Sequence, residues 1–577
     1  MAKIRLAQFS GEIPKLLTRL LPDTGAQLAE NVRLDDGGLT PVRKSGIEAV
    51  FAGASGIKTI YKFGSTWLYW TSVVNAAPGP VATDRLYYTG DGAPKMRVGS
   101  TIYPLAISAP TAALTAGLSG TGTGNVTTRL YVYTWVTDFG EESEPCPISA
   151  DVLWQSGLTV TLSGFQATPA GRSISKQRIY RSQSSSQNGT DLFFIEERTA
   201  STSNYVDTHS PTDFQEVLPS RDYNQPPADL TGLIALPNGM MAGFSGKQLC
   251  FSEPYQPHAW PQKYRLTSPY QIVGIGAYGT TIVAGTTGYP YVVSGNSPDS
   301  MIEQRIEVNL PCINGRGLVD LGYSVAYPSN DGLVVVSSGG ATVVTDALFT
   351  RADWQKLSPS SFISAQFMGR YFASFSYGNS DGTTTSGTRV IDLTGQQPFV
   401  LRQSFHADAF FYDIASGNLY YAVNDTVYGF DTFGELNASM TWTSKRIVLS
   451  NPSSFGAILV ESGALLSAED QAAQNAAIAA IDAANAIVFA SPMNAEIDAS
   501  PINTFAFAGD ALQSHPASKY ISVRVYADGK LICTVNDLDK VNRIRPINAR
   551  EWEIQVNGTA EVEQITMATT ARELAEI

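Results

Sequence analysis

The stretch "MMAGFSGKQLCFSE" at residues 240–253 predicts two short apolar strands joined by a tight turn. The same pattern returns in "TIVAGTTGYPYVVSG" (281–295) and in "SVAYPSNDGLVVVSS" (324–338). The glycines of the three turns, 42 and 44 residues apart, are Gly246, Gly288 and Gly332. Four-stranded units that recur about every 40–50 residues are typical of a β-propeller, because one blade cannot bury both of its faces alone. The repeat therefore predicts a mainly-β fold with a β-propeller-like core.

Further strand pairs extend this pattern in both directions along the chain. They are "GIKTIYKFGSTWLYWTS" (56–72), "DRLYYTGDGAPKMRV" (84–98), "RYFASFSYGNSDGTTTSGTRVIDL" (370–393) and "FFYDIASGNLYYAVNDTVYGFD" (410–431). We therefore expect an N-terminal segment with the first blades at 1–106 and the main blades at 223–440.

A different pattern separates these two groups of blades. The Gly/Thr/Ala-rich stretch "TAALTAGLSGTGTGN" (111–125) has the composition of a linker. It is followed by short alternating strands such as "RLYVYTWVTDFG" (129–140), with turn residues between them. Closely spaced short strands indicate a small β-sandwich. We expect an inserted β-sandwich, similar to fibronectin or immunoglobulin domains, at 107–222.

The C-terminal region, 441–577, predicts a β-domain that carries one long helix at 467–490. Ser467 is a suitable N-cap, and Glu469 and Asp470 suit the positive end of the helix dipole. The helix interior is mostly alanine, which predicts either close packing against a neighbour, in an assembly or on the β-domain, or a helix held by its propensity alone.

Two turn signals predict strands after this helix. Asp528-Gly529 lies between two apolar runs and predicts a hairpin. Asn557-Gly558, within 550–570, predicts a second turn of the same kind.

Composition limits the classes of function. The chain has 577 residues, 16% of them charged, and a net charge of −13 without any basic run, which argues against a protein that reads nucleic-acid sequence. No signal peptide and no apolar run long enough for a membrane helix are visible, so we expect no stable membrane insertion.

No pattern of catalytic, cofactor-binding or metal-ligating residues stands out, so none is predicted. The cysteines are widely spaced and the histidines are never paired at ligand spacing; they are Cys146, Cys250, Cys312, Cys533, His209, His258, His406 and His515. Neither an Asp box nor a nucleophile elbow is present. A glycosidase with paired carboxylates stays open, because its residues would come from distant blades.

The stretch "FSEPYQPHAWPQKY" (251–264) allows two interpretations. As a functional site, Glu253, His258 and Trp260 would line a sugar pocket. As a structural element, the prolines would rigidify a loop between blades, the rings would pack it down and Glu253 would cap it. Proline fixes φ and removes backbone donors, so the structural interpretation is favoured.

Several stretches resemble the tail nozzle proteins of short-tailed bacteriophages, also called tail tubular protein B. They are "LPDTGAQLAENVRLDDGGLTPVRKSG" (21–46), "GFSGKQLCFSEPYQPHAWPQKY" (243–264), "GTTGYPYVVSG" (285–295) and "PCINGRGLVDLGYSVAYPSNDGLVVV" (311–336). The resemblance covers about residues 5–445 and, more loosely, the C-terminal stretch 551–577. These stretches carry no catalytic signature.

The resemblance implies a structural virion protein rather than an enzyme. It implies a homohexameric ring in the tail, below the portal and its adaptor ring, that closes the tail and conducts genomic DNA without reading its sequence. Tail fibres are a further implied partner. Two alternatives remain open: a receptor- or carbohydrate-binding propeller of the tail tip, using rings such as Tyr255 and Trp260, and a glycan depolymerase.

Overall fold

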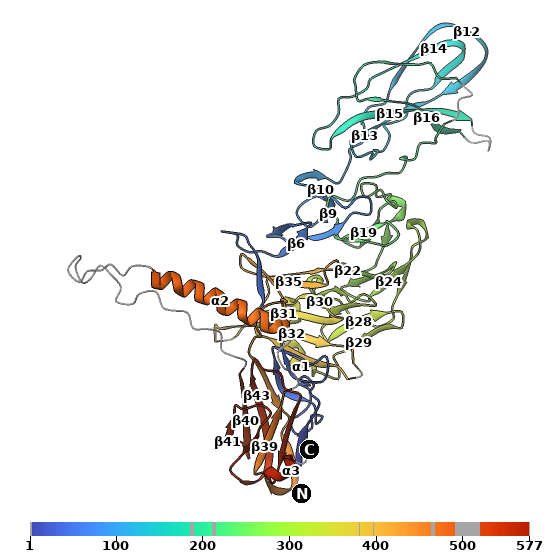
Figure 1. The fold of residues 1–577 in the computed structure, drawn as a ribbon. Helices are drawn as coiled ribbons and strands as arrows, with labels where there is room; N and C mark the ends of the chain where they lie inside the picture. The colour runs from blue at the N-terminus through green and yellow to red at the C-terminus, as the bar shows by residue number, and fades with distance from the viewer. Residues whose placement is uncertain are drawn as a thin grey trace. The chain divides into compact units, whose positions relative to one another are not determined.

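The structure, a computed structural model, describes residues 3–184, 190–210, 215–379, 381–395, 397–462, 468–490 and 520–575. Strands account for 49% of the residues and helices for 7%, which confirms the predicted mainly-β fold. The chain divides into two compact units, whose elements Figure 1 labels. Unit 1 comprises Met1–Gly56, Asp331–Leu333 and Val343–Ile577, and unit 2 comprises Ile57–Asn330 and Val334–Thr342.

Unit 2 contains four-stranded antiparallel sheets whose strands follow one another in sequence. They are β8 (Asn75–Pro78), β9 (Arg85–Thr89), β10 (Lys95–Val98) and β11 (Thr101–Pro104); β18 (Thr231–Ala235), β19 (Met241–Ser245), β20 (Gln248–Phe251) and β21 (Leu266–Thr267); β22 (Ile272–Tyr278), β23 (Thr281–Thr286), β24 (Tyr291–Ser294) and β25 (Ile302–Arg305); and β26 (Val319–Asp320), β27 (Val325–Pro328), β28 (Leu333–Ser337) and β29 (Gly340–Val343). A further hairpin consists of β6 (Thr59–Phe63) and β7 (Thr66–Trp70).

The three sequence repeats are the inner strand pairs of these sheets. They correspond to β19–β20, β23–β24 and β27–β28. Gly246 makes the first turn with a φ of 59°, a conformation that glycine adopts without steric cost. Each repeat therefore forms the hairpin expected of a blade, while closure of the sheets around a common axis stays a prediction.

The inserted segment of unit 2 folds into two three-stranded sheets around one apolar core. One sheet has the order β12-β14-β17 and the other β13-β15-β16. The strands are β12 (Thr115–Arg129), β13 (Tyr131–Thr137), β14 (Val152–Ser163), β15 (Ile174–Ser184), β16 (Thr190–Thr199) and β17 (Tyr205–Asp207). Strand β13, "YVYTWVT", is buried at every position, and its aromatic residues pack with both sheets in the core. A relationship to fibronectin or immunoglobulin domains stays a prediction.

The linker predicted at 111–125 is wrong, because most of this stretch belongs to the 15-residue strand β12. Threonine favours strands, and β12 forms a long antiparallel ladder with β14 that includes two register shifts. Gly120 and Gly157 both have positive φ, and a Cβ on Gly157 would lie 2.6 Å from the carbonyl oxygen of Thr121. Glycine is therefore present for close backbone approach within a sheet rather than for flexibility.

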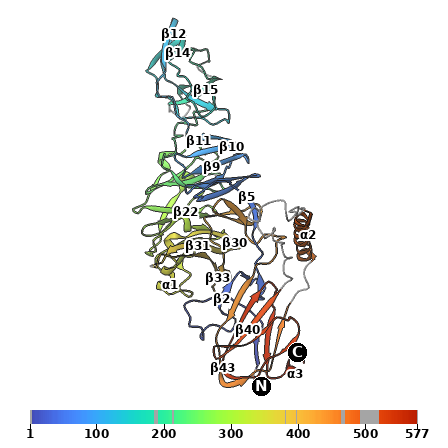
Figure 2. The same ribbon diagram turned by 90° about the vertical axis from the view of Figure 1, so that its left-hand side faces the viewer.

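Unit 1 contains one large sheet that joins segments from distant parts of the sequence. Its strands run in the order β30-β31-β32-β33-β2-β37-β43-β40-β41, with β38 also paired to β43. They are β2 (Ala26–Glu30), β30 (Ile363–Phe367), β31 (Arg370–Gly378), β32 (Thr384–Asp392), β33 (Phe399–Gln403), β37 (Met440–Ser444), β38 (Ile447–Ser454), β40 (Ile521–Ala527), β41 (Lys530–Val535) and β43 (Asn548–Gly558). Figure 2 shows β40 beside β43 in this sheet. N-terminal strand β2 pairs with β33 and β37, so the sheet can form only when both ends of the chain meet.

Smaller sheets of unit 1 repeat this joining of distant segments. One has the order β1-β44-β39-β42, another β34-β35-β36-β5, and β3 pairs with β4. Their strands are β1 (Lys3–Leu6), β3 (Val32–Arg33), β4 (Thr40–Pro41), β5 (Gly46–Val50), β34 (Ala409–Asp413), β35 (Asn418–Val423), β36 (Thr426–Gly429), β39 (Ala457–Glu461), β42 (Val541–Arg543) and β44 (Gln564–Ala568). The main apolar core of unit 1 includes Trp442 and Trp552, both fully buried.

The two turn predictions in the C-terminal region have opposite outcomes. Asp528 and Gly529, both with positive φ, join β40 to β41, which confirms the predicted hairpin. The second turn, at Asn557-Gly558, is wrong: β43 continues through Gly558, which pairs with both Met440 and Ile521. A Cβ on Gly558 would lie 2.3 Å from the carbonyl oxygen of Tyr520, so this glycine lets a neighbouring strand approach.

The α-helices of the described residues are α1 (Arg351–Lys356), α2 (Ala468–Ala490) and α3 (Ala571–Ala575). Short 3-10 turns occur at Gln262–Tyr264, Pro298–Ser300, Gly315–Gly317 and Pro359–Ser361. Helix α2 matches the predicted long helix, while its proposed N-cap, Ser467, lies outside the described residues. Within the described chain, we find no helix with the length and hydrophobicity of a bilayer span.

Candidate functional site

The proline-rich stretch 251–264 forms a corner that connects β20 to β21 in unit 2. The corner is closed by its own backbone, since Glu253 and Gln256 form an isolated bridge and the Glu253 amide donates to the Ala259 carbonyl oxygen across 2.9 Å. Tyr255 takes a positive φ of 58° at the tip. The segment is thus fixed by hydrogen bonds as well as by its prolines.

Trp260 anchors this corner in the core. Its indole is fully buried in an apolar cluster that also contains Tyr87, Met96 and Met241. The indole N–H donates to the carbonyl oxygen of Pro257 across 2.8 Å, which satisfies the ring's one polar atom. The ring therefore packs against other strands and is not available to stack on a sugar.

His258 is also buried, and it connects the corner to the inserted sandwich. Its Nε2 lies 2.9 Å from the backbone carbonyl oxygen of Glu142. A carbonyl oxygen only accepts, so Nε2 carries the proton. The other nitrogen, Nδ1, faces Oε1 of Glu141 at 4.0 Å. The pKa of His258 is lowered to about 4. Burial is the main cause, Arg172 also lowers the pKa, and Glu141 raises it.

A buried ion pair lies beside this imidazole. Arg172 Nη2 and Glu141 Oε2 are 2.7 Å apart, and both side chains are almost fully buried. Glu141 Oε1, His258 Nδ1 and the Nε and Nη1 atoms of Arg172 have no hydrogen-bond partner among the described protein atoms. These charged groups lie at the junction between the sandwich and the corner.

Glu142 organises the sandwich side of the junction. Its carboxylate accepts hydrogen bonds from the hydroxyls of Thr134 and Tyr180, both across 2.7 Å, and from Arg178 Nη1 across 3.1 Å. Burial, together with this carboxylate, raises the pKa of Tyr180 above its usual range. The phenol therefore stays protonated and acts as a donor.

The remaining predicted pocket residue, Glu253, accepts a hydrogen bond from the hydroxyl of Tyr264 across 2.9 Å. Tyr255 is 56% exposed, and its ring covers Gly239, where an added Cβ would meet the ring at 2.6 Å. The side chains of the corner thus make separate contacts and do not line a common pocket. Their placement fits a rigid structural corner.

Sequence reasoning missed a second charged cluster, inside the sandwich. Arg181 and Asp207 form a salt bridge of 2.8 Å in which both side chains are fully buried. The hydroxyl of Tyr131 donates to the same carboxylate across 2.8 Å, and the guanidinium of Arg129 lies 3.6 Å from the ring centroid of Trp154. Because these residues belong to different strands and several of them are far apart in sequence, no local signal indicates the cluster.

The cysteines and histidines of the described chain do not assemble into a metal site. No group of three or more potential ligands is found among the described residues. Cys146, Cys250 and Cys312 are buried thiols, and burial raises the pKa of Cys312 to about 12. His406 contacts Ser374 and His209 lies near Glu196, while His515 is outside the described residues.

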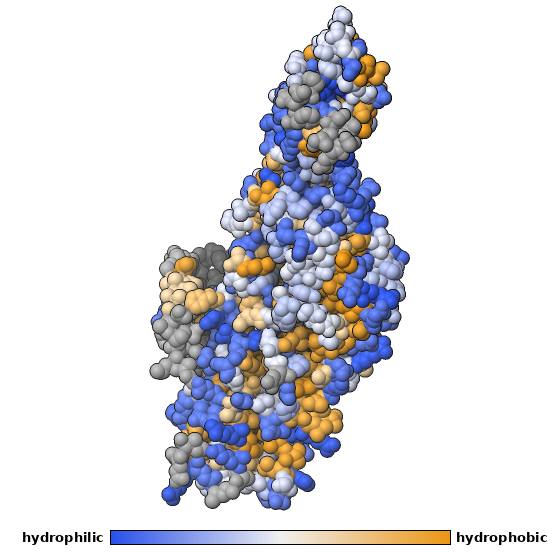
Figure 3. Space-filling view, turned by 90° about the vertical axis from the view of Figure 1, so that its right-hand side faces the viewer, coloured by the Kyte–Doolittle hydropathy of each residue, from blue (hydrophilic) through white to orange (hydrophobic). Residues whose placement is uncertain are grey.

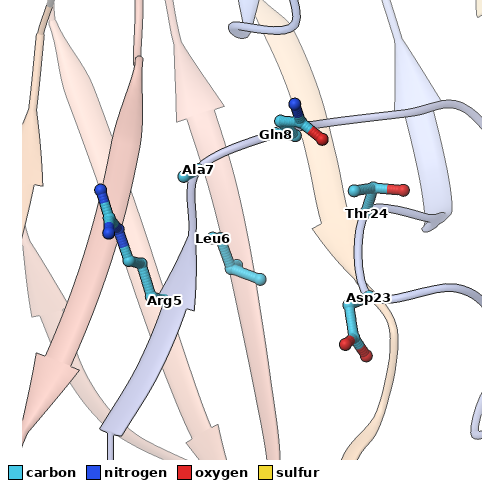
Figure 4. A pocket seen from close by; sticks show the side chains of 6 residues that line it. All are labelled: Arg5, Leu6, Ala7, Gln8, Asp23 and Thr24. Carbon is cyan, nitrogen blue, oxygen red and sulfur yellow. The ribbon is translucent and has the colours of Figure 1, made fainter.

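One surface hollow of unit 1, beside β1, offers little convergent chemistry. Figure 4 shows this hollow, lined by Arg5, Leu6 and Gln8 and, from a second segment, by Asp23 and Thr24. Arg5 and Asp23 point in different directions, and the Arg5 guanidinium donates to Gln564 across 2.7 Å. Apolar side chains also reach the surface in several patches, some of which are visible in Figure 3.

Neither a protein-family model nor a curated protein matches the chain. Among solved structures, the extracellular domain of a putative hybrid two-component system from B. thetaiotaomicron matches with 11% identity and a TM-score of 0.27, covering 73% of this chain and 43% of that one. The chain thus spans less than half the length of this neighbour. The AfRom2 CNH domain matches with 10% identity and a TM-score of 0.27, covering 68% of this chain and 100% of that one. Values this low do not establish a common fold.

Proposed function

We propose that this protein is a structural component of a phage virion: a homohexameric tail nozzle that closes the tail of a short-tailed phage and conducts DNA during ejection. The observation that carries the proposal is the resemblance of the 243–264 stretch, "GFSGKQLCFSEPYQPHAWPQKY", to nozzle proteins. In the structure this stretch forms the end of β19, β20 and the buried corner.

The contacts of this stretch are those of a scaffold. Trp260 is fixed in the core, and His258 bonds to the backbone of the inserted sandwich, 116 residues away in sequence. A resemblance that includes no catalytic residues is consistent with a shared structural scaffold. The proposal accordingly assigns the protein no enzymatic activity.

The net charge suits a passage for DNA. One copy carries −13, so six copies carry six times −13, or −78. Basic groups along a channel would bind phosphates through counterion release and slow the transit of DNA, whereas an acidic wall does not hold it. We therefore propose that genomic DNA passes without sequence-specific contacts.

Exposed apolar side chains support extensive contacts with other proteins. In unit 1 the exposed large apolar residues include Leu17, Leu20, Ile47 and Phe433. Exposed apolar surface commonly marks interaction sites. We propose that neighbouring copies, the adaptor ring below the portal and tail fibres cover such surface in the virion tail.

The alternatives receive less support from the corner. A carbohydrate-binding propeller would need exposed aromatic rings at 251–264. Trp260 is buried, and among the aromatic side chains of the corner only that of Tyr255 is largely exposed.

A depolymerase would release reducing sugars from host surface polysaccharides. We expect no such release, and turnover that disappears on substitution of a carboxylate in unit 2 would favour the depolymerase.

Reconstruction of the virion tail by cryo-electron microscopy tests the proposal. The expected result is six copies of the chain around the DNA axis, beneath the adaptor ring. Three copies at the periphery of the tail, or any position away from the DNA axis, would exclude the nozzle and favour the receptor-binding alternative.

A further inference from the structure

An apolar groove with a basic rim lies on unit 1. Its apolar side chains are Leu17 and Leu20, 63% and 60% exposed, together with the exposed Val448 of β38. The segment that carries the leucines forms two successive backbone turns, in which the Leu16 amide donates to the Ile13 carbonyl oxygen and the Leu20 amide donates to the Leu17 carbonyl oxygen. Exposed apolar side chains that gather in a groove indicate a binding surface.

The rim of this groove is positively charged. Arg19, Arg446 and Arg550 line it, against one carboxylate, that of Glu551. The Arg446–Glu551 pair is loose at 3.8 Å, and Arg550 Nε donates to the carbonyl oxygen of Leu449 across 3.2 Å. Three cations and one anion leave an excess of two positive charges. In a chain with a net charge of −13, this groove is complementary to acidic surfaces of the same protein.

Helix α2 has the matching properties. It contains three carboxylates and neither lysine nor arginine. No position whose exposure is described is buried, and Ile487 is 70% exposed. Its exposed positions include a stripe of alanines at helical spacing, formed by Ala472, Ala476, Ala479 and Ala483.

We propose that α2 of one copy of the chain lies in the Leu17–Leu20 groove of a second copy. The leucines would pack on the flat alanine stripe, and the exposed carboxylate of Asp482 would face the arginines of the rim. Among the described residues, those that line the groove of one copy include none from its own α2. The contact thus joins two different surfaces of neighbouring copies.

Such a contact is heterologous, and it closes into a ring when the rotation between copies divides a full turn. This last step rests on the proposed function, since a nozzle requires a closed ring. The contact itself does not depend on it, because the same two surfaces would also join copies in an assembly that is not a nozzle.

Cysteine cross-linking in assembled particles tests the contact. We would combine Leu20→Cys with Ala479→Cys in the full chain, oxidise the particles mildly and run a non-reducing gel. Both positions are exposed, so the fold should tolerate the changes. Disulfide-linked multimers of the chain are expected. The matched control pairs Ala479→Cys with Val126→Cys, an exposed apolar position in unit 2, and should stay monomeric on the gel.

Maleimide labelling before oxidation makes a negative result decisive. If both introduced thiols react with maleimide but no multimers form, the proposal is overturned, as it is if the disulfide forms within one chain. A second pair, Arg446→Cys with Ala483→Cys, tests the same contact if the first double variant does not assemble into particles. If neither double variant assembles while the control pair does, the two surfaces are needed for assembly, which supports the contact.

Substitution without cross-linking provides an independent measurement. Leu17→Asp with Leu20→Asp should reduce incorporation of the chain into particles at least tenfold, whereas Ile414→Asp, at a more exposed apolar position of the same unit, should not. Equal incorporation of both variants would overturn the proposal. A six-fold axial ring without the cross-link would refute only this contact, and the cross-link without an axial ring would refute only the nozzle.

Discussion

His258 donates a hydrogen bond from Nε2 to the backbone carbonyl oxygen of Glu142, across 2.9 Å and 116 residues of sequence. This bond fixes the tautomer of the imidazole and leaves Nδ1 unprotonated, facing the carboxylate of Glu141 at 4.0 Å. The bond also joins the proline-rich corner to the inserted sandwich. The stability of this junction should therefore depend on the protonation state of one buried histidine.

Unit 2 should become less stable in acid. The unfolded imidazole binds a proton near pH 6.5, while burial lowers the pKa of folded His258 to about 4. The contribution of neutral His258 is therefore complete above about pH 6.5 and is lost as the pH falls toward 4. The free energy of unfolding of unit 2 should drop by about 3 kcal/mol over this interval through this residue.

Denaturant unfolding of wild type and His258→Gln, measured at several pH values, checks this prediction. The glutamine amide can still donate to Glu142 but does not titrate, so the variant should lose less stability between pH 6.5 and 4. The same substitution at the half-buried His406 provides the control. Identical pH profiles for wild type and His258→Gln would contradict the prediction.

Trp260→Ala should destabilise unit 2 by roughly 3–5 kcal/mol, because it leaves a cavity beside Tyr87 and Met241 and removes the bond to Pro257. Thermal unfolding measures the effect, with Tyr255→Ala as the exposed aromatic control. An unchanged melting temperature combined with a loss of glycan or host binding would instead support the pocket interpretation of 251–264.

Asp207→Asn should destabilise the sandwich by about 3–5 kcal/mol, because it leaves the fully buried guanidinium of Arg181 without its counter-ion. Chemical denaturation of wild type and variant measures the difference, with Asp191→Asn, at a partly exposed carboxylate of the same sandwich, as the control. Equal stabilities of wild type and Asp207→Asn would contradict the prediction.

Ala479→Trp tests whether the outer face of α2 meets a neighbour. The position is exposed, so the isolated chain should change in stability by no more than about 0.5 kcal/mol. Assembly into particles should fall, because a bulky ring prevents close approach of another backbone. Val126→Trp, in the sandwich, should assemble normally. Normal assembly of Ala479→Trp would mean that this face of α2 remains solvated.

Local patterns were enough to predict many of the elements. Alternating apolar residues around Gly246 and around Asp528-Gly529 indicate hairpins, and both form. The alanine-rich stretch indicates a long helix, and α2 ends at the expected residue, Ala490. These predictions succeed because turn geometry and helix propensity depend on residues close together in the chain.

Patterns that depend on distant partners misled the sequence analysis. The Gly/Thr-rich residues of β12 look like a linker until β14 supplies the other half of the ladder. Asn557-Gly558 looks like a hairpin turn, but Met440 and Ile521 lie opposite Gly558 and extend the strand. No position of α2 whose exposure is described is buried, and close packing of this helix against a neighbour stays a prediction.

The sequence by itself determined the mainly-β class, the hairpins and the position of the long helix, because these follow from interactions over a few residues. Only the tertiary structure decided that His258 meets Glu142, that Arg181 meets Asp207 and that N-terminal β2 lies between β33 and β37. Such contacts join residues that are far apart in the chain, and the loop-closure entropy that opposes them is offset only when whole sheets pack together. The contacts of His258 and Arg181 are of this long-range kind, so local sequence patterns could not predict them.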